Sequence, residues 1–200
     1  MQTSVTISTV AAIGFALAAC GQASRNESSA SDNMVTANEV GSVDNNMATA
    51  NGATAAPSAM TAAQFAATAA ASDKYEIESS KLAESQASRT DVKDFASMLV
   101  KDHSNSTAEL KSIASKEHIA LSPPALDPAM QGKIDALKAA KGAQFDTLYL
   151  TQQVPAHETA LKMMQDYAAT GDNEAVKGFA TKTSTVVQKH LDRARELSKQ

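Results

Sequence analysis

The chain has 200 residues, of which 4% are aromatic and none is tryptophan, and its formal net charge is −4. This composition favours helices with small contact residues over a β-sandwich, whose strands are rich in aromatic and β-branched side chains. The acidic balance and the lack of a basic block argue against nucleic acid as a partner, and the single cysteine excludes an internal disulfide and a CxxC metal or redox site.

Residues 1–19 have the layout of a secretory signal peptide. An apolar stretch, short for a transmembrane span and without a preceding Lys or Arg, ends in the tetrapeptide LAAC at Cys20. This tetrapeptide resembles the bacterial lipobox, whose cysteine becomes the lipidated first residue of the mature protein. We therefore expect Cys20 to anchor the protein to a membrane without spanning it. An ordinary signal peptide cut nearby, or a free thiol, is the alternative. By the same resemblance, Gly21 in place of an aspartate implies an outer-membrane location facing the periplasm of a Gram-negative cell.

Residues 20–60 are predicted to be a disordered tether that begins at the lipidated cysteine. They are rich in Ala, Asn, Ser and Thr and carry almost no large apolar side chain. Such a segment cannot bury enough surface to offset the entropy lost on ordering. About 40 flexible residues span roughly 35 Å root-mean-square, which would hold a folded domain off the membrane surface.

The composition changes at Thr61, and residues 61–200 are predicted to form one helical domain. Thr61 to Gln64 has the form of a capping box at a helix N-terminus. Asp127-Pro128 is a good N-cap and N1 pair and opens a short helix in the 118–142 connection. The long helices are expected over about 61–87, 90–117, 143–169 and from near Asp172 almost to the end. Tight turns join them into two antiparallel hairpins, so the predicted fold is an all-α, up-down four-helix bundle.

Two residues of the third long helix carry a specific expectation. Gly171 is predicted to end this helix as a C′ glycine. Pro155 falls inside the helix, where it removes a backbone donor and clashes with the preceding turn. A kink, or a bend around something in the core, is therefore expected there.

Each long helix carries one polar, metal-capable residue on its inward face when the chain is followed at 100° per residue. In chain order these residues are Glu76, His103, His157 and His190. Counted from the first turn, Glu76 and His103 should lie at one level. Counted from the second turn, His157 and His190 should be offset by roughly 6 Å, about one helical turn. The sequence therefore predicts that the four side chains gather near the middle of the bundle.

Four segments of the chain resemble domain of unknown function family 4142: YEIESSKLA, VKDFASMLVKDH, FDTLYLTQQVPAHETAL and KHLDRARE. The resemblance covers about residues 61–197. It implies an exported bacterial protein with a ferritin-like helical bundle and no established enzymatic activity. Position by position, it picks out Glu76, Asp102, His103, Asp146, Tyr149, His157 and His190.

A ferritin-like fold suggests di-iron chemistry, but the sequence argues against it. A carboxylate di-iron site needs a Glu-x-x-His motif from each of two helices. The residues three positions before the histidines are Val100, Val154 and Val187. If the domain has any activity, a metal-dependent redox reaction is expected.

Two interpretations of the inward polar residues remain open. In the favoured one, they form a buried hydrogen-bond network in a structural or stress-related envelope protein, with Asp146, Tyr149 or Gln153 satisfying the remaining polar atoms. In the other, Glu76 and the three histidines bind one transition-metal ion. Asp102 is expected to be a solvated neighbour of this cluster or an acceptor behind a ligand. Ring nitrogens that converge on one point would favour the metal, and pairwise hydrogen bonds the network.

Overall fold

The computed structural model describes residues 60–200. The predicted signal peptide, Cys20 and the tether up to residue 59 lie outside this range. Within it the chain is all-helical and contains no strand, which confirms the all-α class. The helices are α1 (Ala62–Gln86), α2 (Thr90–Lys116), α3 (Pro128–Ala139), α4 (Gly142–Thr170) and α5 (Glu174–Leu197).

The helices α1, α3 and α5 begin where the local sequence provides acceptors for free backbone N–H groups. At α1 the predicted capping box is present: the Gln64 amide donates to the Thr61 hydroxyl over 3.3 Å, and the Thr61 amide donates to the Gln64 side chain over 2.9 Å. Asp127 caps α3 ahead of Pro128, and Asn173 caps α5. The starts of these three helices are therefore encoded locally.

The start of α2 has no side-chain cap of its own. Instead, the Asp146 carboxylate of α4 accepts from the backbone N–H groups of Ser88 and Arg89 over 3.0 and 3.1 Å, and from the Ser88 hydroxyl. A buried carboxylate is thus satisfied by a turn that would otherwise leave its amides without acceptors. Asp146 ties the α1–α2 turn to the other half of the domain.

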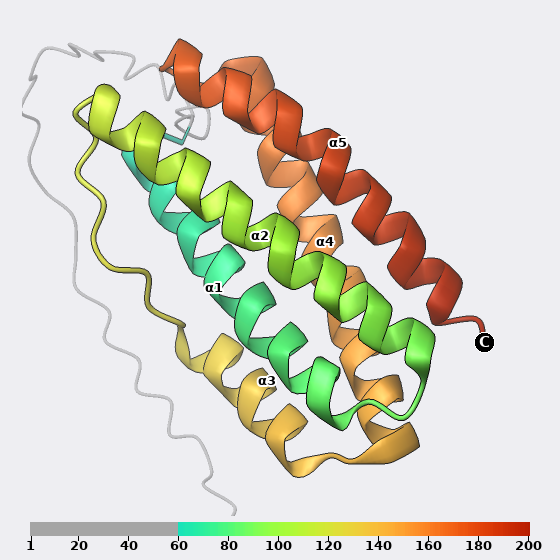
Figure 1. Cartoon of the computed structure of the whole chain (residues 1–200). Coiled ribbons are helices and arrows are strands. Elements are labelled where there is room, and N and C mark those ends of the chain that lie inside the picture. The colour runs from blue at the N-terminus through green and yellow to red at the C-terminus, as the bar shows by residue number, and fades with distance from the viewer. Residues whose placement is uncertain (1–59) are drawn as a thin grey trace, which may run out of the picture. The chain divides into compact units, whose positions relative to one another are not determined.

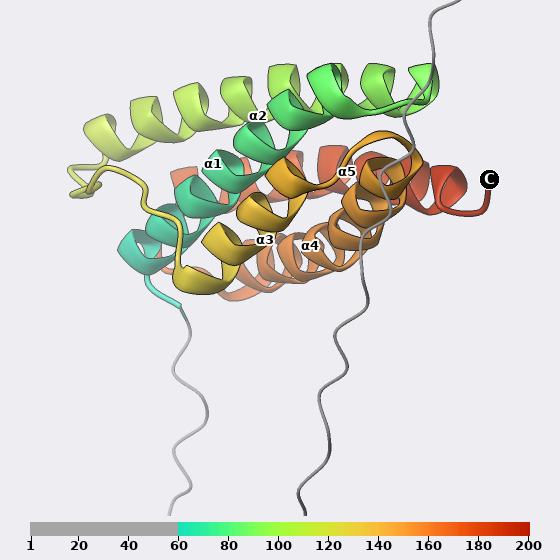
Figure 2. The same ribbon diagram turned by 90° about the horizontal axis from the view of Figure 1, so that it is seen from below.

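The four long helices run side by side as two hairpins (Figure 1). Residues 87–89 join α1 to α2, residues 171–173 join α4 to α5, and within each pair the helices pack along each other. Further packing of α2 with α5 and of α1 with α4 brings the hairpins together. The short α3 lies against α1 and α4 (Figure 2) and buries Ile134 and Leu137.

Gly171 ends α4, but not in the left-handed conformation expected of a C′ glycine. It is the C-cap residue, with φ −60° and ψ 153°, a backbone that any residue adopts. Glycine is required for a different reason: a Cβ at this position would lie 2.5 Å from the Tyr167 ring. The tyrosine folds back over the helix end, where its hydroxyl donates to Asp172 over 2.8 Å.

Pro155 lies within α4, which continues from Gly142 to Thr170 without a break. The proline is on the exposed side of the helix. The carbonyl group that loses its intrahelical donor there can be hydrated, so the helix continues past the proline.

The interior has three layers along the helices. At one end, the Phe65 cluster contains Ala62, Phe65, Ala66, Ala69, Ala70, Leu110, Met164, Tyr167, Val176, Phe179 and Ala180. At the other end, the Phe95 cluster contains Ala83, Ala87, Val92, Phe95, Ala96, Leu99, Leu137, Phe145, Tyr149, Leu150, Ala194 and Leu197. Buried polar residues separate them: Asp73, Glu76, Ser79, Ser80, His103, Gln152, Gln153, His157 and His190.

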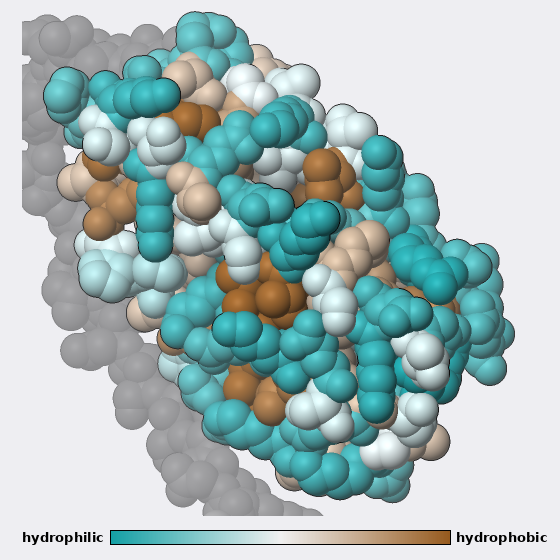
Figure 3. All heavy atoms as spheres, viewed as in Figure 1, coloured by the Kyte–Doolittle hydropathy of each residue, from teal (hydrophilic) through white to brown (hydrophobic). Residues whose placement is uncertain are grey.

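In the view of Figure 3 most of the surface is hydrophilic, and the hydrophobic residues form separate patches. Over residues 60–200, each helix is either too short or too polar to cross a bilayer.

Candidate metal centre

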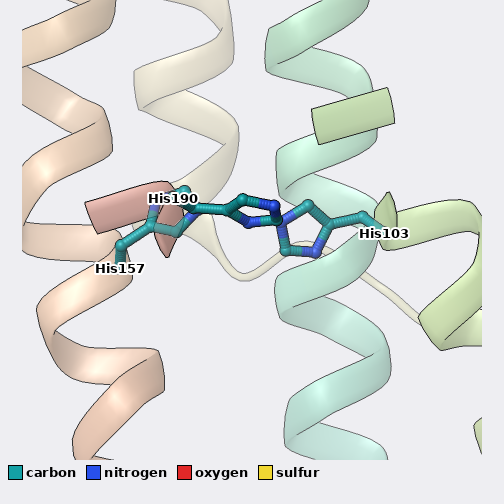
Figure 4. A group of neighbouring side chains, drawn as sticks. All are labelled: His103, His157 and His190. Carbon is teal, nitrogen blue, oxygen red and sulfur yellow. The ribbon is translucent and has the colours of Figure 1, made fainter. Parts of the chain in front are cut away.

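Three histidines from three helices meet in the polar layer. His103 of α2, His157 of α4 and His190 of α5 are buried, and each offers a nitrogen that lies within 4.8 Å of the other two. The ring centroids of His103 and His157 are 5.8 Å apart, and those of the other two pairs are 5.5 Å apart. Figure 4 shows the three rings turned toward one another. They form a cluster that we call the histidine triad.

Each ring is held from behind by a hydrogen-bond acceptor. The Nδ1 of His103 pairs with Asp73 over 2.8 Å, and the Nε2 of His190 pairs with Asp102 over 3.0 Å. The Nδ1 of His157 pairs with the backbone carbonyl oxygen of Gln153 over 2.9 Å. Carboxylate and carbonyl oxygens accept hydrogen bonds, so in each ring the outer nitrogen carries the proton.

The inner nitrogens are therefore the unprotonated ones in a neutral ring. These atoms, Nε2 of His103, Nε2 of His157 and Nδ1 of His190, are buried and have no hydrogen-bond partner among the described residues. Three lone pairs thus face a common space without a donor. Burying an unpaired polar atom costs about 1–3 kcal/mol, and a cation at this position would satisfy all three at once.

The electrostatic environment keeps two of the three rings neutral. Burial and, to a lesser extent, the neighbouring charge of His103 lower the pKa of His157 to about 4. Burial likewise lowers the pKa of His190 to about 4, against the opposing hydrogen bond to Asp102. Burial also acts to lower the pKa of His103, but the hydrogen bond to Asp73 and the charges of Glu76, Asp73 and Asp102 outweigh it, so this pKa is raised. At most one ring of the triad, that of His103, therefore takes up a second proton and becomes positively charged near neutral pH.

Glu76 lies in the same layer but outside the histidine triad. This residue is 2% exposed, and its Oε2 atom has no hydrogen-bond partner in the described part of the chain. Burial raises the pKa of Glu76 to about 7, although His103 and the side chain of Gln153 act in the opposite direction. The structure thus brings three of the four proposed ligands within 4.8 Å and leaves the carboxylate out of that group.

The other polar residues singled out from the sequence have different positions. Asp102 supports His190, and Gln153 supports His157 through its carbonyl oxygen. Tyr149 shares a 2.8 Å hydrogen bond with Ser80 and packs against Phe95 and Phe145, within the Phe95 cluster. Asp146 caps α2 at the α1–α2 turn, and none of its hydrogen bonds within residues 60–200 reaches a triad histidine.

Sequence reasoning missed Asp73, the carboxylate behind His103. This residue is 4% exposed, and its carboxylate also accepts from the Thr107 hydroxyl over 2.9 Å. The signal was present in the spacing, because Asp73 and His103 lie equally far on either side of Ser88, the middle of the three-residue turn. Placing the turn centre between residues 89 and 90 shifts the predicted partner by one helical turn, to Glu76.

The predicted offset of about one turn between His157 and His190 refers to their positions along the helices and does not keep their rings apart, because the two ring centroids are 5.5 Å apart. The reason is the tilt of helical side chains toward the helix N-terminus. For His157 this direction leads away from the α4–α5 turn, and for His190 it leads toward that turn. The two tilts compensate for the difference in residue count, and the rings meet.

The donor set fits a transition-metal ion. Three neutral imidazoles are ligands for zinc, copper, iron or nickel. Nitrogens bound at about 2.1 Å in a tetrahedral arrangement lie about 3.4 Å apart, so the triad rings need to close inward by less than about 1 Å each. The supporting Asp73, Asp102 and Gln153 contacts match the usual arrangement in which an acceptor fixes the outer nitrogen of a metal-binding histidine.

Solved structures with a similar fold carry the name CopM. The chain matches "CopM in the Cu(II)-bound form" with a TM-score of 0.60 and 15% identity over 70% of this chain and 96% of that chain. It matches the Cu(I)-bound form with a TM-score of 0.57 and 16% identity, over 68% of this chain and 94% of that chain. The Ag-bound form, obtained by co-crystallization, matches with a TM-score of 0.58 and 18% identity, over 68% of this chain and 93% of that chain. At these identities the similarity shows the fold alone.

Sequence comparison gives the family directly. The search of curated proteins finds no match. A family described as "Domain of unknown function (DUF4142)" matches residues 46–197. This range includes all three histidines of the triad and their supporting residues, and it confirms the resemblance inferred from the sequence segments. The chain belongs to the DUF4142 family.

Proposed function

We propose that this protein binds one transition-metal ion through Nε2 of His103, Nε2 of His157 and Nδ1 of His190. The observation that carries the proposal is the convergence of three buried ring nitrogens that lack a partner within the described residues, while the opposite nitrogen of every ring is held by an acceptor. A hydrogen-bond network would pair these inner atoms with one another or with Glu76. Here the hydrogen bonds surround the triad and leave its centre for a cation.

The charges around the triad support a cation of charge two. Asp73 and Asp102 lie directly behind two of the rings and together offset two positive charges. Buried charge is tolerated when it is paired with opposite charge nearby. The copper- and silver-bound states named for the similar CopM structures are consistent with metal binding on this fold. When bound, the ion would act as a Lewis acid or a redox centre, and the histidines would hold and orient it.

Titration of the metal-free full chain with Co(II) tests the proposal, because the visible absorption of Co(II) reports its ligands. We expect one Co(II) per chain, displaced by one equivalent of Zn(II) or Cu(II). The variant His157→Ala should lose this binding, whereas His118→Ala should retain it because His118 is exposed and lies outside the triad. Absence of a bound ion in the folded wild-type chain, or equal binding by His157→Ala, would contradict the proposal.

The finer description of the protein is also proposed here. We infer a ferritin-like, up-down four-helix bundle, with α3 as an addition to its second connection, anchored by lipid on Cys20 to the outer membrane and facing the periplasm. The LAAC tetrapeptide and the separate polar segment that follows it support this location. Labelling of expressing cells with radioactive palmitate should mark the wild-type chain and not the variant Cys20→Ser. Equal labelling of both chains would rule out the anchor.

A further inference from the structure

The histidine triad has two different sides along the helix axes. One helical turn away in one direction are Glu76, Gln153 and two residues of the Phe95 cluster, Leu99 and Ala194. In the other direction lies a cavity of about 20 Å³ between the triad and the Phe65 cluster. The triad itself forms part of the wall of this cavity through His103 and His190.

The cavity has room for only a very small ligand. A volume of about 10–15 Å³ on this measure accommodates one water molecule, so about 20 Å³ leaves room for one or two non-hydrogen atoms. Small or aliphatic side chains, among them Ala69, Met164 and Val187, form most of the remaining wall. A ligand with a ring or a branched chain would clash with them.

Several wall residues besides the histidines are polar, among them Asp73, Asp102 and Ser106. Ser106 lies one helical turn after His103 on α2, and its hydroxyl oxygen is buried without a hydrogen-bond partner among the described residues. An unpaired buried hydroxyl is rare in a well-packed interior. A ligand in the cavity would supply the missing partner and would at the same time be next to two of the three histidines.

Resting on the metal site proposed above, we propose that the bound ion keeps a fourth coordination position open into this cavity. The position takes a ligand of one or two non-hydrogen atoms, such as water, hydroxide or a diatomic molecule, and Ser106 hydrogen-bonds to it. A tetrahedral ion with three protein ligands has one such position, which is the arrangement of catalytic metal sites and not of closed structural ones. Glu76, on the opposite side of the triad, does not fill it.

The test uses the full chain loaded with Co(II). One equivalent of cyanide, with two non-hydrogen atoms, should change the visible spectrum while the cobalt content stays at one per chain. Imidazole, with five ring atoms, should leave the spectrum unchanged at the same concentration. An unchanged spectrum with cyanide, loss of cobalt, or equally tight binding of imidazole would overturn the proposal. If no Co(II) binds at all, the metal site itself is wrong, and the two failures are therefore distinguishable.

Substitutions of Ser106 test whether the added cyanide binds in the cavity next to this residue. Ser106→Val replaces the hydroxyl by two methyl groups that fill the cavity, so cyanide binding should weaken at least about tenfold while Co(II) is retained. Ser106→Ala removes only the hydrogen bond and should weaken cyanide binding about fivefold. Glu76→Gln should leave cyanide affinity unchanged. Wild-type affinity in Ser106→Val would overturn the location, and a large gain in Glu76→Gln would show that Glu76 occupies the fourth position instead.

Discussion

The Phe65 cluster and the histidine layer lie on the same four long helices, but they are stabilised in opposite ways. In the Phe65 cluster, the ring of Phe65 stacks on Tyr167 at 4.3 Å and meets Phe179 edge-on at 6.3 Å, and burial of apolar surface supplies the free energy. In the histidine layer, buried polar atoms are paired at their outer ends and unpaired at the centre. The comparison indicates that the first region stabilises the domain and that the second uses part of that stability to hold a binding site.

The substitution with the largest expected effect, Phe65→Ala, tests whether the Phe65 cluster and the histidine layer are independent of each other. Phe65→Ala should lower the free energy of unfolding by about 3–5 kcal/mol, because it leaves a cavity in the apolar cluster. Urea unfolding of the metal-free chain measures this loss. Under conditions in which the variant is folded, it should still bind one metal ion. Ala67→Ser, at an exposed position on the same helix, should change stability by less than about 0.5 kcal/mol. Loss of metal binding by folded Phe65→Ala would show that the regions are not independent.

Burial of Glu76 in the histidine layer should make the free energy of unfolding depend on pH. The pKa of Glu76 is raised from 4.5 to about 7 in the folded chain. A raised pKa means that the folded state binds the proton more tightly than the unfolded state. The stabilisation from Glu76 is therefore complete below about pH 4.5 and is lost as the pH rises through about 7.

The variant Glu76→Gln has no titrating group at this position. Its free energy of unfolding should therefore increase relative to that of the wild type as the pH rises. The difference in unfolding free energy between the two metal-free chains should change by about 3 kcal/mol between pH 4.5 and pH 8. Chemical unfolding at a series of pH values measures it. Groups that do not interact with Glu76 contribute equally to both chains and cancel in the difference, whereas His103 does not cancel completely, because the charge of Glu76 raises its pKa. A difference that does not depend on pH would mean that Glu76 is not buried as the structure has it.

The smallest expected effects come from substitutions of two carboxylates in the histidine layer, Asp73 and Asp102. Asp73→Asn should weaken metal binding by about 10–100-fold, because a supporting carboxylate makes its histidine a better ligand. Asp102→Asn should cost less, since the Asp102 side chain is 33% exposed and solvent screens its charge, whereas that of Asp73 is 6% exposed. Competition with a chelator of known affinity measures both. Asp135→Asn, on the exposed side of α3, serves as the control. A larger loss for Asp102→Asn would contradict the role assigned to burial.

Some parts of the site could be predicted because they follow from helix periodicity. His103, His157 and His190 are buried as their spacing on the inward faces predicts. Their partners could not be predicted with the same accuracy. An error of one to two residues in the turn centre led to Glu76 in place of Asp73, because one helical turn separates these two residues on the same face. Asp146, which the family resemblance and the network interpretation place with the polar cluster, instead caps α2.

The sequence by itself determined the all-α class, the local caps at Thr61, Asp127 and Asn173, and which residues face inward, because these depend on contacts within a few residues along the chain. Only the tertiary structure decided which buried polar atoms are paired. The same three imidazoles would form a hydrogen-bond network if their protonated nitrogens pointed inward. The positions of Asp73, Asp102 and the Gln153 carbonyl oxygen on neighbouring turns draw the protons outward and leave the lone pairs facing one another.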